Sequence, residues 1–405
     1  MKNNTCRVCL KKINEFMSFG KMPIANSFLN KTDIKNQFFY EMLVAFCQNC
    51  FTFQLMNVPK PKQMFNENYA YLASTSKIMK NHWKNLSTQI KKNYNLNKNS
   101  FVVEIGSNDG IFLENISNSN IPHLGVDASR NVSEIAKSKG INSLNTFFDV
   151  KSANEIRSSY GKADVIISTN TMHHIENINS VVEGMGELLK SDGTIITEDP
   201  SLKEMLIKNS YDQIYAEHMY IWSLSSMNSL FGKYGMEIYN IENNEFHGGC
   251  SRYYIAKKNK KKISKEVFKH MKIENKLAIN KISTYKKFKK KTVDSKNKLV
   301  NFLHKLKKKN KVIVGYGAPA KSTTVLNYCG IDSSIIDKIF DNSETKISKY
   351  TPGKSLIYID NSDNFNLYKS DYCVLFAWNH QKEILKKEKK YNGKWIVPVP
   401  ELRVI

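Results

Sequence analysis

The stretch Phe101-Val-Val-Glu-Ile-Gly-Ser-Asn-Asp-Gly110 joins a short apolar run to a turn that contains two glycines. An apolar run that ends in a glycine turn predicts a buried β-strand, here over 101–105, followed by a helix. The glycines let the backbone pass close to a ligand, and Glu104 places a carboxylate at the end of the strand. The stretch therefore predicts a strand–turn–helix unit with a ligand at the turn.

The same alternation of strand and helix signals continues on both sides of this stretch. Further strands are predicted over 124–126, 164–168 and 194–197, and helices over Lys77–Asn93, Val132–Lys139 and Val181–Leu189. The last of these helices should end at the turn Ser191-Asp192-Gly193. Alternation of this kind predicts an α/β domain with a mostly parallel sheet and helices on both faces.

The spacing of the two glycines bears on the ligand. Three residues separate Gly106 from Gly110, whereas the dinucleotide-binding motif is G-x-G-x-x-G. This spacing favours S-adenosylmethionine (SAM), although another nucleotide or a plain turn remains an alternative for the loop alone. Asp127 ends the next strand, where a carboxylate receives ribose hydroxyls, and a polar strand end follows at Thr169-Asn170. The predicted SAM site consists of Glu104, Gly106, Asn108, Gly110, Asp127 and Asn170.

Four of the seven cysteines form two Cys-x-x-Cys pairs, Cys6 with Cys9 and Cys47 with Cys50. Each pair places two thiolates on one side of a tight loop, and two such loops make a tetrahedral zinc site. Because sulfur fills all four positions, the zinc should be structural. A thioredoxin-like redox motif would need a βαβ context that this region lacks, and the odd cysteine count argues against a secreted disulfide framework.

The chain has 405 residues and a formal net charge of +24, which is unevenly distributed. Residues 257–311 contain 22 Lys, no Arg and three acidic residues, a net charge of +19. The absence of Arg favours a solvated helical segment over a nucleic-acid surface. Apolar residues at helical spacing predict one or two amphipathic helices here: Phe268, Met271, Ala278, Ile282, Tyr285, Leu299, Leu303 and Leu306.

A second glycine loop follows this segment. Gly315-Tyr-Gly-Ala-Pro-Ala320 after the apolar run 312–314 is close to a dinucleotide fingerprint, so NAD is an alternative ligand at this point. No acidic residue follows at the end of a clear second strand before Asp337 and Asp341, which is a doubtful match. Strands over 338–340, 372–376 and 395–397 predict a second, smaller α/β unit.

Two groups of histidines occupy positions where chemistry could occur. His173-His174 follow the strand 164–168 at its carboxyl end, where open α/β sheets place ligands. Tyr215-Ala-Glu217-His218 lies in an aromatic-rich run after the last parallel strand. A histidine in an apolar pocket beside a carboxylate can act as a base, but a packed histidine is an equally good interpretation of the spacing.

The whole chain resembles the SAM-dependent C-methyltransferases that branch nucleotide-activated deoxysugars. The resemblance is carried, in chain order, by CRVC and FCQNC, Met22-Pro-Ile-Ala-Asn-Ser-Phe-Leu29, VVEIGSNDG, IYAEH, His247-Gly-Gly249 with Arg252, Gly315-Tyr-Gly-Ala-Pro-Ala-Lys-Ser322, Asn327-Tyr328 and Val397-Pro-Val-Pro400. Together these motifs extend over nearly all of the chain. Two positions differ from the family pattern, since Ala216 stands where a histidine is frequent and Cys250 where serine is common.

The resemblance implies a role for each matching residue. His218 takes the position of the general base that removes the proton beside a 4-keto group, and Tyr215, Glu217 and His174 line the same site. The carbanion, stabilised as an enolate, then attacks the SAM methyl group. Substrate contacts are expected from His247, Arg252, Lys321, Ser322 and Thr323, the last three at a helix N-terminus that suits a diphosphate better than a nicotinamide.

The expected architecture is therefore an α/β multidomain protein with four parts. These are a zinc-binding domain at 1–65, a Rossmann-like class I SAM methyltransferase domain at 66–256, a Lys-rich helical linker at 257–310 and a Rossmann-like C-terminal domain at 311–405 that contributes to nucleotide-sugar binding. The expected partner is a nucleoside-diphosphate 4-keto-deoxysugar, without a membrane or nucleic acid, and the expected state is a cytoplasmic monomer or weak homo-oligomer. An NAD-dependent sugar-nucleotide oxidoreductase, or a methyltransferase or zinc protein that acts on nucleic acid, is the alternative.

Overall fold

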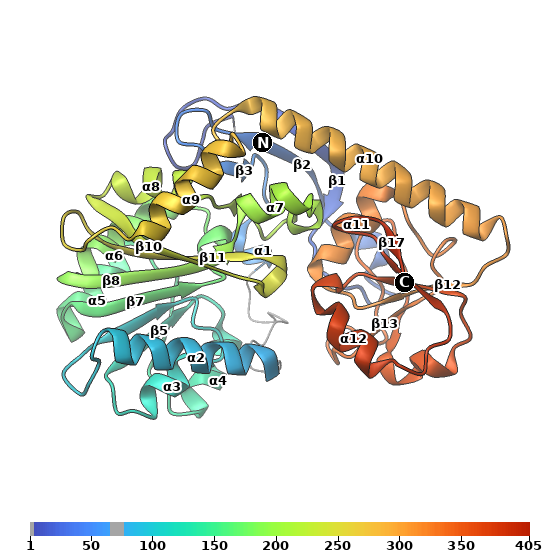
Figure 1. The fold of residues 1–405 in the computed structure, drawn as a ribbon. Coiled ribbons are helices and arrows are strands. Elements are labelled where there is room, and N and C mark those ends of the chain that lie inside the picture. The colour runs from blue at the N-terminus through green and yellow to red at the C-terminus, as the bar shows by residue number, and fades with distance from the viewer. Residues whose placement is uncertain (1–3, 65–76) are drawn as a thin grey trace.

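The computed structural model describes residues 4–64 and 77–405, which form three β-sheets connected by helices (Figure 1). The boundary expected between residues 65 and 66 lies outside the described residues. None of the described helices is both long and apolar enough to cross a bilayer.

The largest sheet has seven strands in the order β10-β11-β8-β7-β4-β5-β6. Five strands are parallel, and β11 runs antiparallel to both of its neighbours. The strands are β4 (Val102–Ile105), β5 (His123–Asp127), β6 (Ser143–Asn145), β7 (Ala163–Thr169), β8 (Leu189–Pro200), β10 (Met236–Asn244) and β11 (Cys250–Lys257). The strand order reverses at β4, so the crevice at the carboxyl ends of β4 and β7 is where such a sheet binds a ligand.

Helices cover both faces of this sheet because successive strand residues point to opposite sides. On one face, Val102 belongs to the same apolar cluster as Trp83 of α2 and Leu113 of α3. On the other face, Val103 belongs to a second cluster that contains Ile156 of α5. The helices are α2 (Lys77–Asn93), α3 (Leu113–Ser117), α4 (Arg130–Ser138), α5 (Val150–Tyr160), α6 (Ile178–Leu188), α7 (Leu202–Lys208) and α8 (Leu224–Gly232). The predicted turn at 191–193 is wrong, because these residues form a bulge inside β8 between the pairs Ala163–Leu189 and Val165–Thr194.

The N-terminal sheet is antiparallel, with the order β1-β2-β3-β9. Its strands are β1 (Glu15–Pro23), β2 (Phe39–Phe46), β3 (Phe53–Leu55) and β9 (Tyr220–Ile221), and the short helix α1 (Pro61–Met64) follows β3. The fourth strand comes from far along the chain, and it begins two residues after His218. The N-terminal sheet is thus completed by the segment that carries the expected base.

The C-terminal sheet has the order β14-β13-β12-β15-β16-β17 and is parallel except for β17. It contains β12 (Ile313–Tyr316), β13 (Ile339–Asp341), β14 (Ile359–Asn361), β15 (Tyr372–Leu375), β16 (Lys394–Val397) and β17 (Arg403–Val404), with the helices α11 (Ala320–Cys329) and α12 (Gln381–Lys387). The sequence does not predict β14 and β17, because β14 has only one buried residue and β17 consists of two exposed residues, so neither carries an apolar strand pattern.

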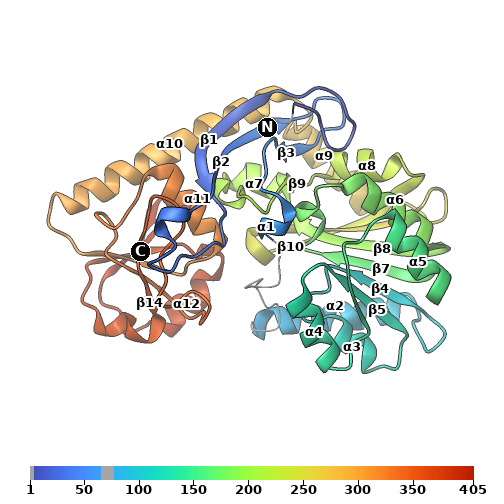
Figure 2. The same cartoon turned by 180° about the vertical axis from the view of Figure 1, so that it is seen from behind.

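Two helices, α9 (Lys265–Lys276) and α10 (Ile282–Lys307), form the Lys-rich segment. Helix α10 extends over the N-terminal strands to the C-terminal sheet in both views (Figures 1 and 2). The prediction that Phe268 faces the core is wrong, since its side chain is 57% exposed and α9 instead buries Val267, His270 and Glu274. Ala278 lies between the two helices with a φ of 51°.

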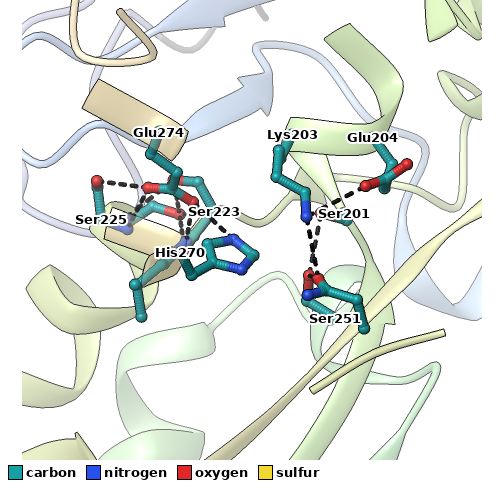
Figure 3. A network of polar contacts seen from close by, with 11 residues as sticks. Ser201, Lys203, Glu204, Ser223, Ser225, Ser251, His270 and Glu274 are labelled. Carbon is teal, nitrogen blue, oxygen red and sulfur yellow. Dashed lines mark hydrogen bonds and ion pairs between the residues drawn. The ribbon is translucent and has the colours of Figure 1, made fainter. Parts of the chain in front are cut away.

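Glu274 explains how a Lys-rich helix docks beside the seven-stranded sheet. Its carboxylate accepts hydrogen bonds from the backbone N–H groups of Leu224 and Ser225 at the start of α8, at 2.7 and 3.0 Å (Figure 3). A carboxylate at a helix N-terminus satisfies donors that have no partner within the helix. A buried acidic residue in α9 therefore attaches the linker to α8, which hydrophobic periodicity alone does not reveal.

Candidate active site

A cleft of about 2760 Å³ separates the seven-stranded sheet from the C-terminal sheet. Its walls include the carboxyl ends of β4, β5 and β7, the loop after β12, and Trp378 of the C-terminal part. Asn26 of the N-terminal part also lines it. The N-terminal part, the seven-stranded sheet and the C-terminal sheet therefore all contribute residues to one cavity.

The first glycine loop forms the end of this cleft beside β4. Gly106 has a φ of 74°, and a Cβ atom placed there would collide with the side chain of Thr171. The carboxylate of Asp127 accepts hydrogen bonds from the backbone N–H groups of Asn108 at 2.9 Å and Ser129 at 2.8 Å. Asp127 therefore holds the loop in shape at the position expected for a ribose-binding acid. Gly110 does not line the cleft, because it packs against Ile141.

Two polar atoms in the same corner fit a ligand that donates hydrogen bonds. Glu104 Oε2 and Asn170 Oδ1 are both buried and have no hydrogen-bond partner among the described residues. Burial, reinforced by Asp127 and Asp109, raises the pKa of Glu104 well above its ordinary value. Buried polar atoms normally have a partner, so these two indicate a ligand at this position. The ammonium and ribose hydroxyls of SAM offer donors of this kind.

The second part of the cleft contains a cluster of imidazoles. The ring centroids of His173, His174 and His218 are 4.0 to 5.3 Å apart, and the Tyr215 ring lies 3.8 Å from that of His218. His218 and Tyr215 precede β9, whereas His173 and His174 belong to a 3-10 turn, Met172–His174, that follows β7. The fold thus unites the two histidine groups that the sequence presents separately.

One hydrogen bond determines the tautomer of His218. Its Nδ1 lies 2.8 Å from the carbonyl oxygen of Gln213, which can only accept, so Nδ1 carries the proton. The lone pair of His218 is therefore at Nε2. Burial, with the charges of His173, His174 and Lys321, lowers the pKa of His218 well below 6.5. The ring is consequently neutral at pH 7 and can accept a proton at Nε2.

Glu217 connects this cluster to the N-terminal part of the chain. Its Oε1 accepts a hydrogen bond from Asn26 Nδ2 at 2.9 Å, and burial raises its pKa. Its Oε2 is buried without a partner among the described residues. One oxygen of Glu217 is therefore still available for a substrate hydroxyl or water.

Sequence reasoning missed a second hydrogen-bonded histidine. His173 Nδ1 lies 2.5 Å from Asp199 Oδ1, and both side chains are fully buried. Burial lowers the pKa of His173 to about 3 and raises that of Asp199 well above its ordinary value. Asp199 lies two residues after the predicted strand 194–197, near the carboxyl end of β8, and this position is the signal that could have identified it.

Lys321 is the cation of the C-terminal wall. Its Nζ donates to the carbonyl oxygen of His247 at 2.7 Å and lies 5.1 Å from the ring centre of Trp378. Trp378 Nε1 in turn donates to Asp212 Oδ2 at 2.6 Å. Burial lowers the pKa of Lys321 and of His247, the latter to about 3. Lys321 and His247 both line the cleft.

Three residues expected to bind substrate have other partners and do not line the cleft. The hydroxyl groups of Ser322 and Thr323 donate to the carbonyl oxygens of Pro319 and Ala25 at 2.7 and 2.9 Å. Arg252 forms an ion pair with Glu198 across β11 and β8, at 2.6 Å. The structure therefore assigns these three side chains to holding the walls of the cleft.

The second glycine loop repeats the geometry of the first. Asp341 ends β13, and its carboxylate accepts hydrogen bonds from the backbone N–H groups of Ala318 at 2.6 Å and Ser343 at 2.8 Å. The match of Asp341 is doubtful from the sequence, and the structure places it beside the loop. Each glycine loop is therefore held by an aspartate at the end of the following strand.

The four paired cysteines form a separate site outside the cleft. The Sγ atoms of Cys6 and Cys50 are 3.5 Å apart, and those of Cys9 and Cys47 are 3.4 Å apart. The four Sγ atoms all lie within 4.8 Å of one another. This spacing suits tetrahedral coordination of a zinc ion with Zn–S bonds of about 2.3 Å. Gln54 Nε2 donates to Cys6 Sγ at 3.0 Å, a contact that favours the thiolate. The donor set fits a structural zinc ion.

Comparisons with known proteins identify relatives of the chain. Three family models match the chain: "Putative zinc binding domain" over residues 6–65, "Methyltransferase domain" over 79–241 and "C-methyltransferase C-terminal domain" over 245–400. C-methyltransferase NovU from Streptomyces niveus is 30% identical over 406 residues, which cover 99% of this chain and 96% of NovU.

Solved methyltransferase structures are also similar to part of the chain. Magnesium protoporphyrin IX methyltransferase from Synechocystis PCC 6803, with bound SAM, matches 44% of this chain and 79% of its own at 12% identity and a TM-score of 0.34. A SAM-dependent methyltransferase from Anabaena variabilis matches 43% of this chain and 83% of its own, at 18% identity and a TM-score of 0.35. Because these TM-scores are low, the assignment depends on the sequence relative and the family models. The chain belongs to the C-methyltransferase family, with SAM as methyl donor, a class I methyltransferase fold and a structural zinc.

Proposed function

We propose that this enzyme methylates C3, the carbon beside the keto group, of a nucleoside-diphosphate 4-keto-6-deoxysugar. The observation that carries the proposal is the tautomer of His218, whose Nε2 keeps its lone pair in a cleft with a glycine loop at each end. A proton on a carbon beside a carbonyl group is acidic enough for a neutral imidazole to remove when the resulting enolate is stabilised.

The two ends of the cleft suggest how the reactants are held. SAM would bind at the first loop, with Glu104, Asn170 and Asp127 as hydrogen-bond acceptors, and it supplies an electrophilic methyl group. The nucleoside diphosphate would bind at the second loop, where the N-terminus of α11 and the cation of Lys321 favour negative charge. This arrangement directs the sugar towards the histidines between the loops.

The chemistry then requires three actions from the chain. His218 Nε2 takes the proton from C3, and the electron pair of that C–H bond moves into an enolate on the 4-keto oxygen. Tyr215 and His174 line the cleft beside His218 and would stabilise this oxygen. As C3 bonds to the methyl carbon, the methyl–sulfur bond breaks, and S-adenosylhomocysteine leaves with that electron pair. Glu217 would position the sugar through its free oxygen.

We further propose that the chain is divided into four working parts with the boundaries 1–65, 66–256, 257–310 and 311–405; a single family match, over 245–400, spans both the linker and the C-terminal part. The support is that each part contributes something distinct: the zinc site, the SAM loop, a bridging helix and the second loop.

Mass spectrometry of a panel of nucleoside-diphosphate 4-keto-6-deoxysugars, incubated with enzyme and with or without SAM, tests this function. We expect a SAM-dependent gain of one CH₂ unit that stays with the sugar after the nucleotide is cleaved. SAM binding without a gain on any sugar would contradict the substrate assignment. A redox change with NAD(H) in the same panel would instead favour the oxidoreductase alternative.

A further inference from the structure

The imidazoles of His173, His174 and His218 form a compact set of potential metal ligands within the cleft. One ring nitrogen from each residue lies within 4.8 Å of one from each of the others. Outside the cysteine site, this is the one group of three or more His, Cys, Asp or Glu residues within the described parts of the chain that could hold a metal ion. All three side chains line the cleft, so a bound ion would remain open to a further ligand on the cleft side.

Two of these rings have the second hydrogen bond that metal-binding histidines require. Such histidines almost always donate their other ring N–H to a carboxylate or a backbone carbonyl, which fixes the tautomer. His173 Nδ1 pairs with the Asp199 carboxylate at 2.5 Å, and His218 Nδ1 donates to the Gln213 carbonyl at 2.8 Å. Each ring therefore keeps Nε2 as the nitrogen that can bind a metal.

Two buried acidic residues lie beside the cluster. Asp199 is fully buried behind His173, and its Oδ2 has no partner among the described residues. Glu217 is adjacent to His218 in the chain and is also buried. Lys321 acts in the opposite direction, because its charge disfavours a further cation near His218. We expect weaker binding here than at the four thiolates.

The ligand type indicates which metals fit. Neutral imidazoles suit Zn²⁺, Cu²⁺ and Ni²⁺, whereas Mg²⁺ and Ca²⁺ prefer oxygen ligands.

We propose that His173, His174 and His218 bind one divalent transition-metal ion such as Zn²⁺, and that this ion inhibits methyl transfer by occupying Nε2 of His218. The inhibitory effect rests on the proposed role of His218 as the base, whereas the metal site itself does not. The ion and the substrate proton compete for the same lone pair, so metal binding and turnover exclude each other.

Zinc stoichiometry tests the site without any substrate. The full chain is dialysed against dilute Zn²⁺ and then measured by elemental mass spectrometry. We expect two zinc ions per wild-type chain, and one per chain in His173→Asn and in His174→Asn. Asp199→Asn should keep the site but weaken it by about 10- to 100-fold. His304→Asn is the matched control, since this histidine is exposed on α10 and should leave the count at two.

Turnover during a zinc titration tests the regulation. We expect methyl transfer to fall in proportion to occupancy of the second site and to recover when the added metal is removed. One zinc per wild-type chain, or a second zinc that persists in both histidine variants, would overturn the site. Full occupancy with unchanged or increased turnover would overturn the inhibition. Wild-type enzyme that methylates no sugar before metal is added would instead count against the proposed function and leave the stoichiometry intact.

Discussion

Asn26 and Glu217 are 191 residues apart in the chain, and their side chains are joined by a 2.9 Å hydrogen bond in the cleft. Helix α11 donates two further hydrogen bonds in the same region. Thr323 donates to the carbonyl oxygen of Ala25, and Thr324 donates to the carbonyl oxygen of Ile214. The segment that carries His218 is therefore held by the N-terminal part and by α11 together. Activity should depend on all three parts of the chain even though the reacting groups lie in one cleft.

Replacing Asn26 tests the first of these connections. Asn26→Ala removes the donor to Glu217, and we expect kcat to fall by about tenfold because a hydrogen bond of this kind contributes about 1.5 kcal/mol. Zinc content and SAM affinity should not change. Asn30→Ala is the control, because its partner Asp33 is an exposed neighbour. Equal activities of the two variants would show that Glu217 needs no support from the N-terminal part.

Loss of zinc should affect the active site through β9. Cys47→Ser removes one ligand directly after β2, and β2 pairs with β3, which in turn pairs with β9 in the same antiparallel sheet. Because β9 follows His218 by two residues, we expect this variant to lose its zinc, to unfold at a lower temperature and to lose turnover. Elemental analysis, thermal denaturation and the methylation assay measure these effects. Full turnover by a zinc-free chain would contradict the coupling.

The first glycine loop, where we propose that SAM binds, permits a test with a matched glycine. In Gly106→Ala the new methyl group collides with Thr171, so SAM affinity should fall by at least about tenfold, or about 1.4 kcal/mol. Gly140 has nearly the same φ, 79° against 74°, but a Cβ atom added there would have no other atom within 4 Å. Gly140→Ala therefore carries the same backbone strain and should bind SAM normally in calorimetry. Similar SAM affinities for both variants would exclude Gly106 from the pocket.

The pH profile should reflect the lowered pKa of His218. The reaction needs the neutral ring, which persists through pH 6.5 because burial and the charges of His173, His174 and Lys321 disfavour protonation. As the pH falls, kcat/KM should therefore stay level through 6.5 and decline only at lower pH. Lys321→Gln removes one positive charge, so the pKa should rise and the decline should begin at higher pH. Lys349→Gln, which changes a lysine elsewhere on the cleft wall, should leave the profile in place.

The sequence predicts the parts of the fold that have a local signature. The strand before each glycine loop is an apolar run closed by a glycine, and Cys-x-x-Cys pairs have only a few common uses. Asp127 could be placed because a ribose-binding acid lies at a known distance along a βαβ unit. Five of the six residues predicted to bind SAM line the cleft, whereas Gly110 supports the loop from behind.

Contacts between distant segments could not be predicted. Nothing in Tyr220-Ile221 indicates that these residues complete a sheet begun two hundred residues earlier, and a lone Asn26 carries no sign of a partner at Glu217. The burial of His270 and Glu274 in place of Phe268 depends on where α8 begins, which one sequence does not specify. Hydrophobic periodicity predicts that a helix is amphipathic. A helix whose buried carboxylate caps a neighbouring helix can nevertheless turn a different face towards the core.

Exchange of the substrate proton with solvent tests the role of His218 most directly. A 4-keto-6-deoxysugar nucleotide is incubated in D₂O with S-adenosylhomocysteine and either wild-type enzyme or His218→Asn, and deuterium at C3 is measured by mass spectrometry and NMR. We expect wild-type enzyme to introduce deuterium at C3, and the variant to slow both exchange and methyl transfer by about 100- to 10,000-fold while it binds SAM as tightly as wild type. Exchange by His218→Asn at the wild-type rate would show that another group removes the proton.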